Sequence, residues 1–584
     1  MDELTVETGA TRAPSLAEDP ALGLPLREKL EILFAVMLGL FLGALDQTIV
    51  GPALPTIVTQ LNGNDVYVWA VTSYLLTSTI SVPFWGKLSD LYGRKPMFIT
   101  GIVIFLIGSA LSGLSQNMGQ LILFRGIQGI GAGSLFPIAL AVIGDLFSPA
   151  ERGKYQGLFG AVFGIAFIAG PLIGGFLTEN ISWHWIFYVN VPIGLVSLFF
   201  IFRLLPTVKN PRATRNFDVL GGVIFTIATA FLLVGLTQKG QVDPATHRLY
   251  DWTAPTVGGF ILISLVGLVL FVWAESRAKE PIVPLGLFRI RTYAAAQVAT
   301  FFAAFAFFGA IIFLPRWFQI VQGFSPTYSG LAALPLMVGL IGSSIASGQI
   351  VARTGRYRWL AVGAIAIMGV STLLMTQLRA DTPVPVVWLW MFISGIGVGP
   401  TFAVFTLIVQ NAVPFNMLGV ATSNLTFFRQ IGGTVALAIV GTIFATGFQN
   451  ELVPQLQAAG VPSQIVAGFG QAASNGQIDF NRLTGTGDMG QVILTSVPAQ
   501  IRPIIEPVVP NLVAGIHQAF SLAVSQTFWI GVGASVLAAL AAAAMQELAL
   551  RRQTPAQAAA AAAASGSGEA RPAEVRRPPL PAAD

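Results

Sequence analysis

Long apolar runs, separated by short polar connections, occupy most of the chain between residues 30 and 546. A helix needs about 20 predominantly apolar residues to cross the hydrocarbon core of a bilayer. Transmembrane β-barrels consist of short strands that alternate apolar and polar residues, whereas these runs are long and continuously apolar. The pattern therefore predicts an all-α membrane protein with 14 transmembrane helices, at residues 30–53, 66–86, 97–115, 119–145, 156–178, 185–205, 218–237, 256–274, 293–320, 327–351, 359–378, 386–412, 419–447 and 514–546.

The composition agrees with a membrane protein and argues against several function classes. Only 10% of the 584 residues are charged, whereas an ordinary soluble domain has about 25%. The net charge of +5 is small for this length and argues against nucleic acid as a partner. The chain lacks cysteine, its three histidines are scattered, and it has no phosphate-binding P-loop pattern. We therefore expect no enzyme activity, no metal and no cofactor.

Lysine and arginine are distributed unevenly between the two sides of the predicted helices. If the N-terminus is placed inside, most basic residues fall in the inner connections and tails. The positive-inside rule then places both termini in the cytoplasm, for a protein of a bacterial-type cytoplasmic (inner) membrane. The N-tail 1–27 is polar and the C-tail 551–584 is rich in alanine and proline. Both tails are expected to be disordered.

An internal repeat divides the chain into two halves. The segment GKLSDLYGRKP at residues 86–96 has a counterpart, GQIVARTGRYR, at residues 348–358. Similarly, GIGAG at residues 129–133 has a counterpart, GIGVG, at residues 395–399. Repeated halves are typical of transporters, with the substrate between them. We therefore predict an N-terminal six-helix bundle, a linker with two extra helices and a C-terminal six-helix bundle, with bounds at 28–205, 206–291 and 292–550.

The C-terminal half contains a long outer connection at residues 448–513. It includes apolar patches such as VPAQIRPIIEPVVP. Long connections in compact structures are usually functional or disordered. We expect short amphipathic helices that rest on the outer mouth, and a flexible insertion is the equally weighted alternative.

Six short segments follow one another at the predicted helices. They are LDQTIVGPALP (45–55), GKLSDLYGRKP (86–96), LILFRGIQGIGAG (121–133), GPLIGG (170–175), WHWIFYVNVPIG (183–194) and FFRQIGG (427–433). Together they resemble the major facilitator superfamily, in its 14-span drug:proton antiporter branch of multidrug resistance exporters. Leu91, Ala166 and His184 depart from the usual residues of these signatures. The resemblance implies two pseudo-symmetric six-helix bundles plus two linker helices, with the proton gradient as energy source.

Asp46 lies inside the first apolar run, eight residues before its end near Leu54. That spacing places it about 12 Å deep, and Arg125 lies about 9 Å into the fourth run from the same side. Charged side chains at such depth are costly, rare and by default functional. In the resembling fold the first and fourth helices are neighbours. We therefore predict that Arg125 controls the binding and release of a proton by Asp46, with a permanent structural ion pair as the alternative.

The connection GKLSDLYGRKP joins the second and third predicted helices on the inner side. Gly86 permits close helix approach, and Gly93 suits a turn with positive φ. We expect Arg94 to pair with Asp145, and Asp90 to lie at the positively polarised N-terminus of the thirteenth helix. Such a contact would join the two halves as a conformational latch of the outward-open state. The alternative is that the basic residues serve only the membrane topology.

Gly170, Pro171, Gly174 and Gly175 lie in the middle of the fifth predicted helix. Proline removes a backbone hydrogen bond and bends a helix, and glycine allows a neighbouring helix to approach closely. The segment is therefore predicted to form a hinge and a tight seam that opposes proton leak. Simple close packing is the alternative.

Arg429 lies about ten residues into the thirteenth predicted helix, near mid-depth. It is a candidate contact for the substrate or for an acid such as Glu179 or Asp46, and a buried structural arginine is the alternative. Glu179 lies near the outer end of the fifth helix, where water could also solvate it.

These features favour a proton-coupled exporter (antiporter) of hydrophobic drugs or other lipophilic compounds that works by alternating access. One alternative is a lipid or glycolipid exporter or flippase on the same fold. Another, from a different class, is a non-transporting membrane receptor or scaffold. The expected partners are a small lipophilic substrate, membrane lipids and protons, and the expected oligomeric state is a monomer.

Overall fold

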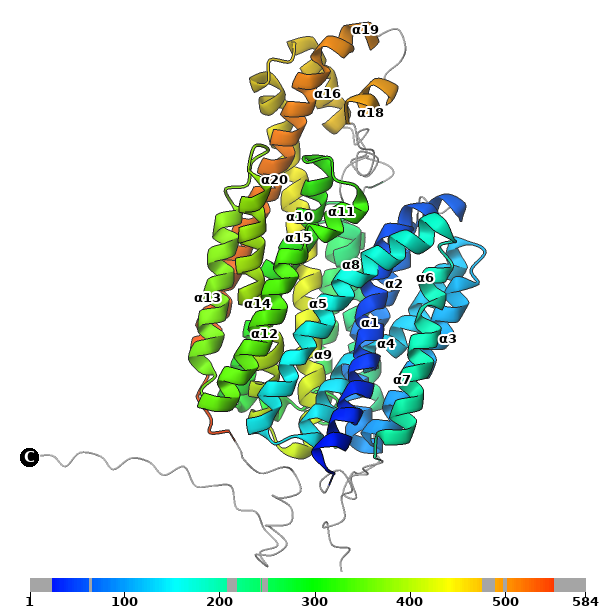
Figure 1. Cartoon of the computed structure of the whole chain (residues 1–584), viewed down its shortest axis with the longest axis vertical. Helices are drawn as coiled ribbons and strands as arrows, with labels where there is room; N and C mark the ends of the chain where they lie inside the picture. The colour runs from blue at the N-terminus through cyan, green and yellow to red at the C-terminus, as the bar shows by residue number, and fades with distance from the viewer. Residues whose placement is uncertain are drawn as a thin grey trace, which may run out of the picture.

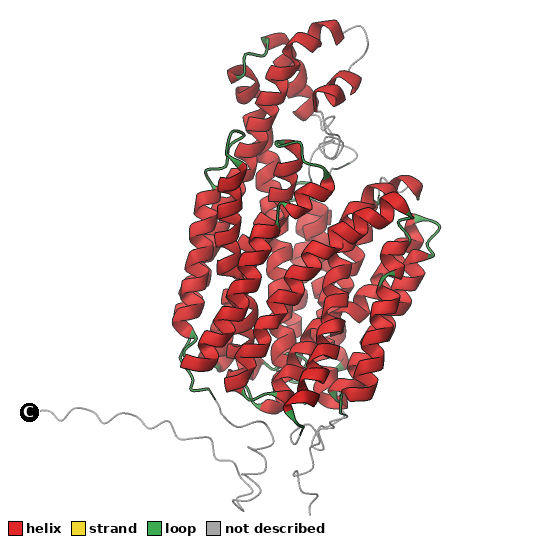
Figure 2. Cartoon of the chain, viewed as in Figure 1, coloured by secondary structure: helices red, strands yellow, loops and turns green. Residues whose placement is uncertain are grey.

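The computed structural model describes residues 24–61, 66–206, 218–241, 243, 250–474, 489–496 and 502–550. Throughout this part of the chain the regular secondary structure is helical, with no strand (Figure 2). Thirteen helices of the described part are long and apolar enough to cross a membrane. The remaining predicted span corresponds to α2 (Tyr67–Tyr92), which is long enough but less apolar, because it contains several serine and threonine residues. The total of 14 spans therefore stays a prediction.

The N-terminal half is a bundle in which small residues bring helices together (Figure 1). A Cβ atom on Gly131 of α4 would lie only 2.4 Å from the backbone nitrogen of Phe105 in α3. Such close approach between backbones is typical of helix packing in membranes. The helices are α1 (Leu26–Gln60), α2, α3 (Arg94–Gly113), α4 (Met118–Leu146), α5 (Pro149–Asn180), α6 (Trp185–Tyr188) and α7 (Asn190–Leu204), and the last two together form one span.

The C-terminal half is a second bundle, in which α10, α15 and α20 pack on one another and α14 packs on α12 and α13. Its helices are α10 (Arg291–Ile320), α11 (Pro326–Leu331), α12 (Leu334–Thr354), α13 (Arg358–Met375), α14 (Val384–Ala412), α15 (Leu418–Ala458) and α20 (Val509–Ala543). Between the two halves in sequence lie α8 (Val219–Lys239) and α9 (Phe260–Glu275). These two linker helices pack on each other, and α8 touches both α2 and α15. One linker helix therefore contacts both halves.

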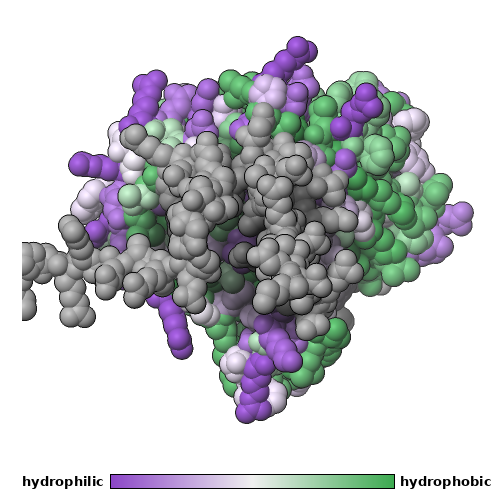
Figure 3. Space-filling model, turned by 90° about the horizontal axis from the view of Figure 1, so that it is seen from below, coloured by the Kyte–Doolittle hydropathy of each residue, from purple (hydrophilic) through white to green (hydrophobic). Residues whose placement is uncertain are grey.

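Both ends of the described chain lie on the same side of the bundle. We call the side where α1 begins and α20 ends the terminal face, and the opposite side the distal face (Figure 1). Figure 3 views the terminal face, where hydrophilic residues project around the rim and hydrophobic residues cover the flanks. The predicted disorder of the tails falls outside the described residues, except that α1 already begins at Leu26.

The long connection after α15 contains short helices, as expected, but it begins later and ends earlier than predicted. The structure extends α15 to Ala458 and begins α20 at Val509, so both helices continue beyond the predicted span limits of 447 and 514. The 41 residues of α15 correspond to about 62 Å of helix, twice the hydrocarbon thickness of a bilayer. Short helices α16 (Ser463–Ser474), α18 (Met489–Ser496) and α19 (Arg502–Ile505) pack near these two extended helices above the distal face (Figure 1).

An apolar core explains why this segment is a helical cap rather than a layer on the mouth. Leu452 and Leu456 of α15, Val466 of α16, Ile493 of α18 and Leu512 of α20 are buried in one cluster. The cluster continues into the core of the C-terminal half. The cap therefore stands on the C-terminal half, carried by α15 and α20.

Candidate functional site

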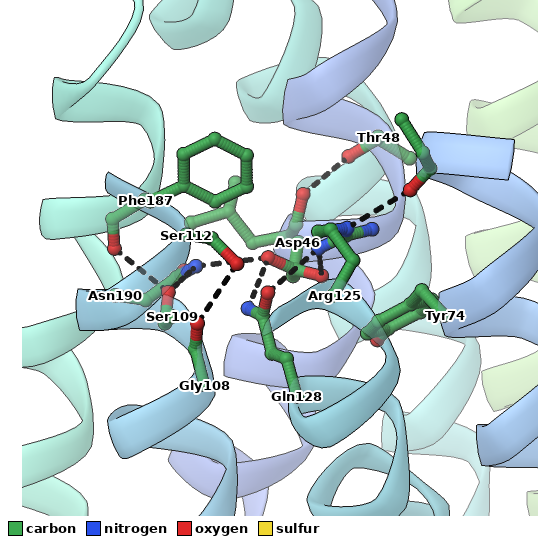
Figure 4. Close-up of polar contacts among 12 residues, drawn as sticks. Asp46, Thr48, Tyr74, Gly108, Ser109, Ser112, Arg125, Gln128, Phe187 and Asn190 are labelled. Carbon is green, nitrogen blue, oxygen red and sulfur yellow. Dashed lines mark hydrogen bonds and ion pairs between the residues drawn. The ribbon is translucent and has the colours of Figure 1, made fainter. Parts of the chain in front are cut away.

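Asp46 is the centre of a buried polar cluster in the N-terminal half (Figure 4). None of its surface is exposed. Nη1 of Arg125 donates to Oδ2 of Asp46 at 2.7 Å, and Nε2 of Gln128 donates to Oδ1 at 2.8 Å. Nδ2 of Asn190 donates to Oδ1 at 3.0 Å. The carboxylate thus accepts three hydrogen bonds, from α4 and α7, and its negative charge is matched by one guanidinium.

Helix geometry explains how these donors converge. Arg125 and Gln128 are three residues apart on α4, so they lie on the same helix face. Nη1 of Arg125 also donates to Oε1 of Gln128 at 2.9 Å, which orients the amide toward Asp46. The guanidinium lies over the ring of Tyr74 in α2, with 4.1 Å between Cζ and the ring centroid. Cation–π contact of this kind stabilises a desolvated arginine.

Two members of this cluster were not predicted from the sequence. Gln128 and Asn190 are neutral, and both lie inside segments that carry the family resemblance. Asn190 also donates to the hydroxyl of Ser109 at 3.1 Å, and Ser109 donates to the carbonyl of Phe187 at 2.9 Å. The sequence feature that could have identified both residues is an amide side chain within an apolar run, because a buried polar group needs a hydrogen-bond partner.

At the terminal face, the connection between α2 and α3 contacts the C-terminal half. The backbone N–H groups of Gly419 and Val420 donate to the carboxylate of Asp90 at 3.0 and 2.8 Å. Asp90 also pairs with Arg94, at 2.5 Å. Arg94 in turn donates from Nε to Asp145 at 2.8 Å. The structure thus brings together the residues expected at this position, and a carboxylate at the N-terminus of α15 is favoured by the helix dipole.

The two glycines of this connection have distinct structural roles. Gly93 adopts a φ of +97°, a conformation that residues with a Cβ atom avoid. Gly86 lies against α15, since a Cβ atom there would be 2.7 Å from the carbonyl oxygen of Gly419. The two halves therefore meet backbone to backbone beside Asp90.

The Gly-Pro segment of α5 packs against α1 beside Asp46. A Cβ atom on Gly170 would lie 2.0 Å from the hydroxyl of Thr48, and one on Gly174 would lie 2.3 Å from the carbonyl oxygen of Ile49. Helix α5 runs unbroken through Pro171. Gly175 is also buried. The segment forms a tight seam with the helix that carries the acid, and its role as a hinge stays a prediction.

Arg429 and Glu179 are not brought together. Nη2 of Arg429 donates to the carbonyl of Thr401 at 3.1 Å, and its Cζ lies 4.3 Å from the ring centroid of Phe402. None of the ion pairs found in the described part of the chain joins Arg429 to an acid. Glu179 is exposed near the distal end of α5.

Comparison with known proteins decides the family. Residues 36–437 match the family model described as Major Facilitator Superfamily. The chain belongs to this superfamily. It is 38% identical over 454 residues to "Multidrug transporter protein MdtP" of Bacillus subtilis (strain 168), which covers 77% of this chain and 82% of the relative. It is also 38% identical over 422 residues to "Multidrug resistance protein 3" of the same organism, covering 72% and 80%.

A solved structure of the superfamily shares the fold. The proton:xylose symporter XylE, bound to 6-bromo-6-deoxy-D-glucose, matches with a TM-score of 0.51 and 13% identity. The match covers 88% of this chain and 95% of the symporter chain. As a member of the Major Facilitator Superfamily, the protein is a membrane transporter and not an enzyme.

The arrangement gives this Major Facilitator Superfamily transporter two separate charged centres. One is the Asp46 cluster, which lies wholly within the N-terminal half. The other is the Asp90 cluster at the terminal face, which joins the two halves. The first has a titratable group in the membrane interior, where such groups mark ion pathways. The second closes the terminal face in the conformation seen here.

Proposed function

We propose that the protein is a proton-coupled exporter of hydrophobic drugs or other lipophilic compounds. The observation that carries the proposal is the full burial of Asp46 against Arg125 at membrane depth. The printed names of the two Bacillus subtilis relatives describe a multidrug transporter and a multidrug resistance protein, which supports the same substrate class.

The Asp46 cluster has two charge states, and each favours a different conformation of the protein. When Asp46 is ionised, Arg125, Gln128 and Asn190 satisfy it. When Asp46 is protonated, the partners of Arg125 seen in the described structure are all neutral: the Gln128 amide, the carbonyl of Ala70 and the rings of Tyr74 and Phe187. Breaking a buried ion pair by neutralising one partner costs about 3–5 kcal/mol. Protonation therefore favours a rearranged state in which water or substrate reaches the cluster.

Alternating access connects that rearrangement to transport. The conformation described has its terminal face closed by the contact of Asp90 with Gly419 and Val420. In the proposed cycle, Asp46 takes up a proton while the distal face is accessible and releases it when the terminal face opens. Energy comes from the proton gradient, whose electrical part is worth about 2.3 kcal/mol per charge per 100 mV. We propose a monomer that takes its lipophilic substrate from the membrane, with both termini in the cytoplasm.

The decisive experiment neutralises Asp46. In proteoliposomes with an imposed pH gradient, Asp46→Asn should lose gradient-driven dye export, by about 100-fold or more, and its melting temperature should fall because Arg125 loses its ion-pair partner. The loss of export follows because asparagine has nearly the same size as aspartate and keeps one acceptor oxygen for Gln128 and Asn190, but it cannot bind and release a proton.

Glu179→Gln supplies the matched control. It removes one carboxylate from the exposed distal end of α5 and should leave export unchanged. If Asp46→Asn exports dye at the wild-type rate under the same gradient, the proton-coupling role of Asp46 is wrong.

A further inference from the structure

Inside the bundle, Arg429 is a positive charge that none of the ion pairs found among the described residues joins to an acid. Asp46, Arg125 and Arg429 lie well inside their helices, and the first two form an ion pair. Among the described residues, the side chain of Arg429 has a carbonyl and an aromatic ring as its partners, those of Thr401 and Phe402. A lone charge inside a membrane protein is costly and marks a functional site by default. A negative group arriving from outside the chain would neutralise it.

Arg429 contacts Phe402 of α14, and Phe402 in turn contacts Phe163 of α5 in the N-terminal half. Residues 422, 426 and 429 share one face of the helix because they are four and seven positions apart. On this face, the hydroxyl of Thr422 donates to the carbonyl of Pro137 in α4, at 3.4 Å. Arg429 is two turns further from the terminal face on the same helix side. It therefore lies beside the boundary between the halves, separated from α5 by the ring of Phe402, and a transporter of this type holds its substrate at that boundary.

Four aromatic rings cross the same boundary. Phe136 of α4 stacks on Phe163 of α5, with 5.0 Å between centroids. Phe163 contacts Phe402 of α14 at 5.1 Å, and Phe402 contacts Phe307 of α10 at 6.3 Å. The guanidinium of Arg429 lies over the third ring of this series. Aromatic faces and a cation thus occur together, which suits a planar apolar molecule that carries a negative group.

A polar group that shares a cavity with Arg429 lacks a hydrogen-bond partner among the described residues. The hydroxyl of Thr300 in α10 is buried, and it has no hydrogen-bond partner within the described chain. Thr300 and Arg429 line the same cavity of about 10 Å³, together with Phe402 and Phe307. A cavity of this size holds about one water molecule. A larger ligand requires the rings of Phe307 and Phe402 to move.

We infer that Arg429 and Thr300 bind the anionic group of a lipophilic substrate, such as a carboxylate or sulfonate, while Phe163 and Phe402 contact its apolar body. This inference rests on the proposed export function and specifies its substrate class. Exchange of one proton inward for one monovalent anion outward moves two charges, whereas a neutral substrate moves one. An inside-negative membrane potential therefore drives the export of the anion more strongly than that of the neutral compound.

Two dyes with the same ring system test the inference. 8-Anilinonaphthalene-1-sulfonate carries a sulfonate, and N-phenyl-1-naphthylamine lacks it. Export of both is measured in proteoliposomes that contain the full chain, with wild type, Arg429→Gln and Arg429→Lys. We expect Arg429→Gln to raise the KM for the anionic dye at least tenfold and to leave the KM for the neutral dye within twofold. Arg429→Lys, which keeps the charge, should recover part of the loss.

Arg353→Gln is the matched control, because it removes an exposed arginine at the terminal end of α12. It should change neither KM. Equal loss of both dyes in Arg429→Gln, or an unchanged KM for the anionic dye, overturns the inference while leaving proton-coupled export intact. If wild type exports neither dye under a pH gradient and a membrane potential, the proposed function itself fails.

Discussion

The two halves meet along two seams that are built differently. At the seam between α5 and α12, backbones lie in contact without charged groups. A Cβ atom on Gly348 would lie 1.9 Å from the carbonyl oxygen of Gly153, and one on Gly157 would lie 2.8 Å from Cα of Ile345. The contact continues along α5 to Gly164, against Ile341. This seam depends on van der Waals contact over several helical turns.

The seam between α2 and α15 is tight only near the terminal face. There Asp90 accepts the two N–H groups at the start of α15. Toward the distal face, α2 and α15 border a pocket of about 210 Å³, whose third wall is α8. Nearer the terminal face, the ring of Phe225 in α8 lies 6.0 Å from Phe84 of α2 and 5.1 Å from Phe427 of α15. One seam is therefore uniform, and the other has an ionic contact at one end and a linker helix beside it.

The difference suggests that the two seams have different roles during alternating access. Close packing between apolar helices includes no charged group whose contact can be broken and remade. The α5–α12 seam can therefore stay in contact during transport and act as a pivot. When α15 moves away from α2, both hydrogen bonds to the carboxylate of Asp90 are lost together. The α2–α15 seam can therefore act as a latch. Interfaces in proteins are bistable rather than continuously deformable, which makes such a latch a two-state element.

The largest expected effect comes from blocking the pivot. In Gly348→Val, the added side chain collides with the backbone of Gly153, and no flexible side chain is available to yield. We expect export to fall to background and the melting temperature to drop by several degrees, because overpacking costs about 1–3 kcal/mol. Dye export and thermal unfolding of the purified protein measure the two effects.

Gly342→Val on the same helix is the control for this prediction. A Cβ atom at Gly342 would meet nothing within 4 Å. Its export and melting temperature should stay near those of wild type. Equal behaviour of the two valine variants would show that the α5–α12 seam is not a close-packed pivot.

The second prediction concerns the latch, and it uses the absence of cysteine in the chain. Thr422→Cys introduces a single thiol at a fully buried position between the halves. In that background, Asp90→Ala removes a carboxylate from a helix N-terminus, where it is worth up to about 2 kcal/mol. At 1.4 kcal/mol per tenfold change, alkylation of the thiol by a maleimide should become faster by up to about 25-fold.

The control for the latch is Glu31→Gln, which neutralises an exposed acid near the start of α1. It should not change the alkylation rate. A rate in Asp90→Ala equal to that of the Thr422→Cys parent would contradict the latch.

The contrast between the seams also shows what the sequence could predict. Apolar runs identified the spans, and the depth of charged residues in them identified Asp46 and Arg125 as residues that meet partners from other helices. Asp90 was predicted instead from its place in the inner connection, beside the start of the thirteenth predicted helix. A charge in an apolar run is a strong signal because it is costly there. Gln128 and Asn190 gave a weak signal, since neutral amides occur in spans for several reasons.

Other features depend on tertiary contacts that hydropathy does not encode. The helices continue past the predicted limits at residues 447 and 514, because buried apolar residues such as Leu456 and Leu512 extend α15 and α20 beyond the predicted spans. The position of α8 beside the α2–α15 seam depends on rings from three helices. The sequence predicted two extra helices but not where they pack.

The smallest expected effect separates the linker from the latch. Nζ of Lys87 in α2 lies 2.6 Å from the carboxylate of Glu280, which follows α9. This ion pair ties the linker to the terminal end of α2, and it is partly exposed. Pairs of this kind contribute about 0–1 kcal/mol. In the Thr422→Cys background, Lys87→Gln should therefore raise the alkylation rate by no more than about fivefold, well below Asp90→Ala. If Lys87→Gln instead matches or exceeds Asp90→Ala, the linker and not the Asp90 contact holds the terminal face closed. In that case α8 and α9 are part of the latch. The two seams then differ because α5 and α12 form a pivot, whereas the linker helices hold the α2–α15 seam closed.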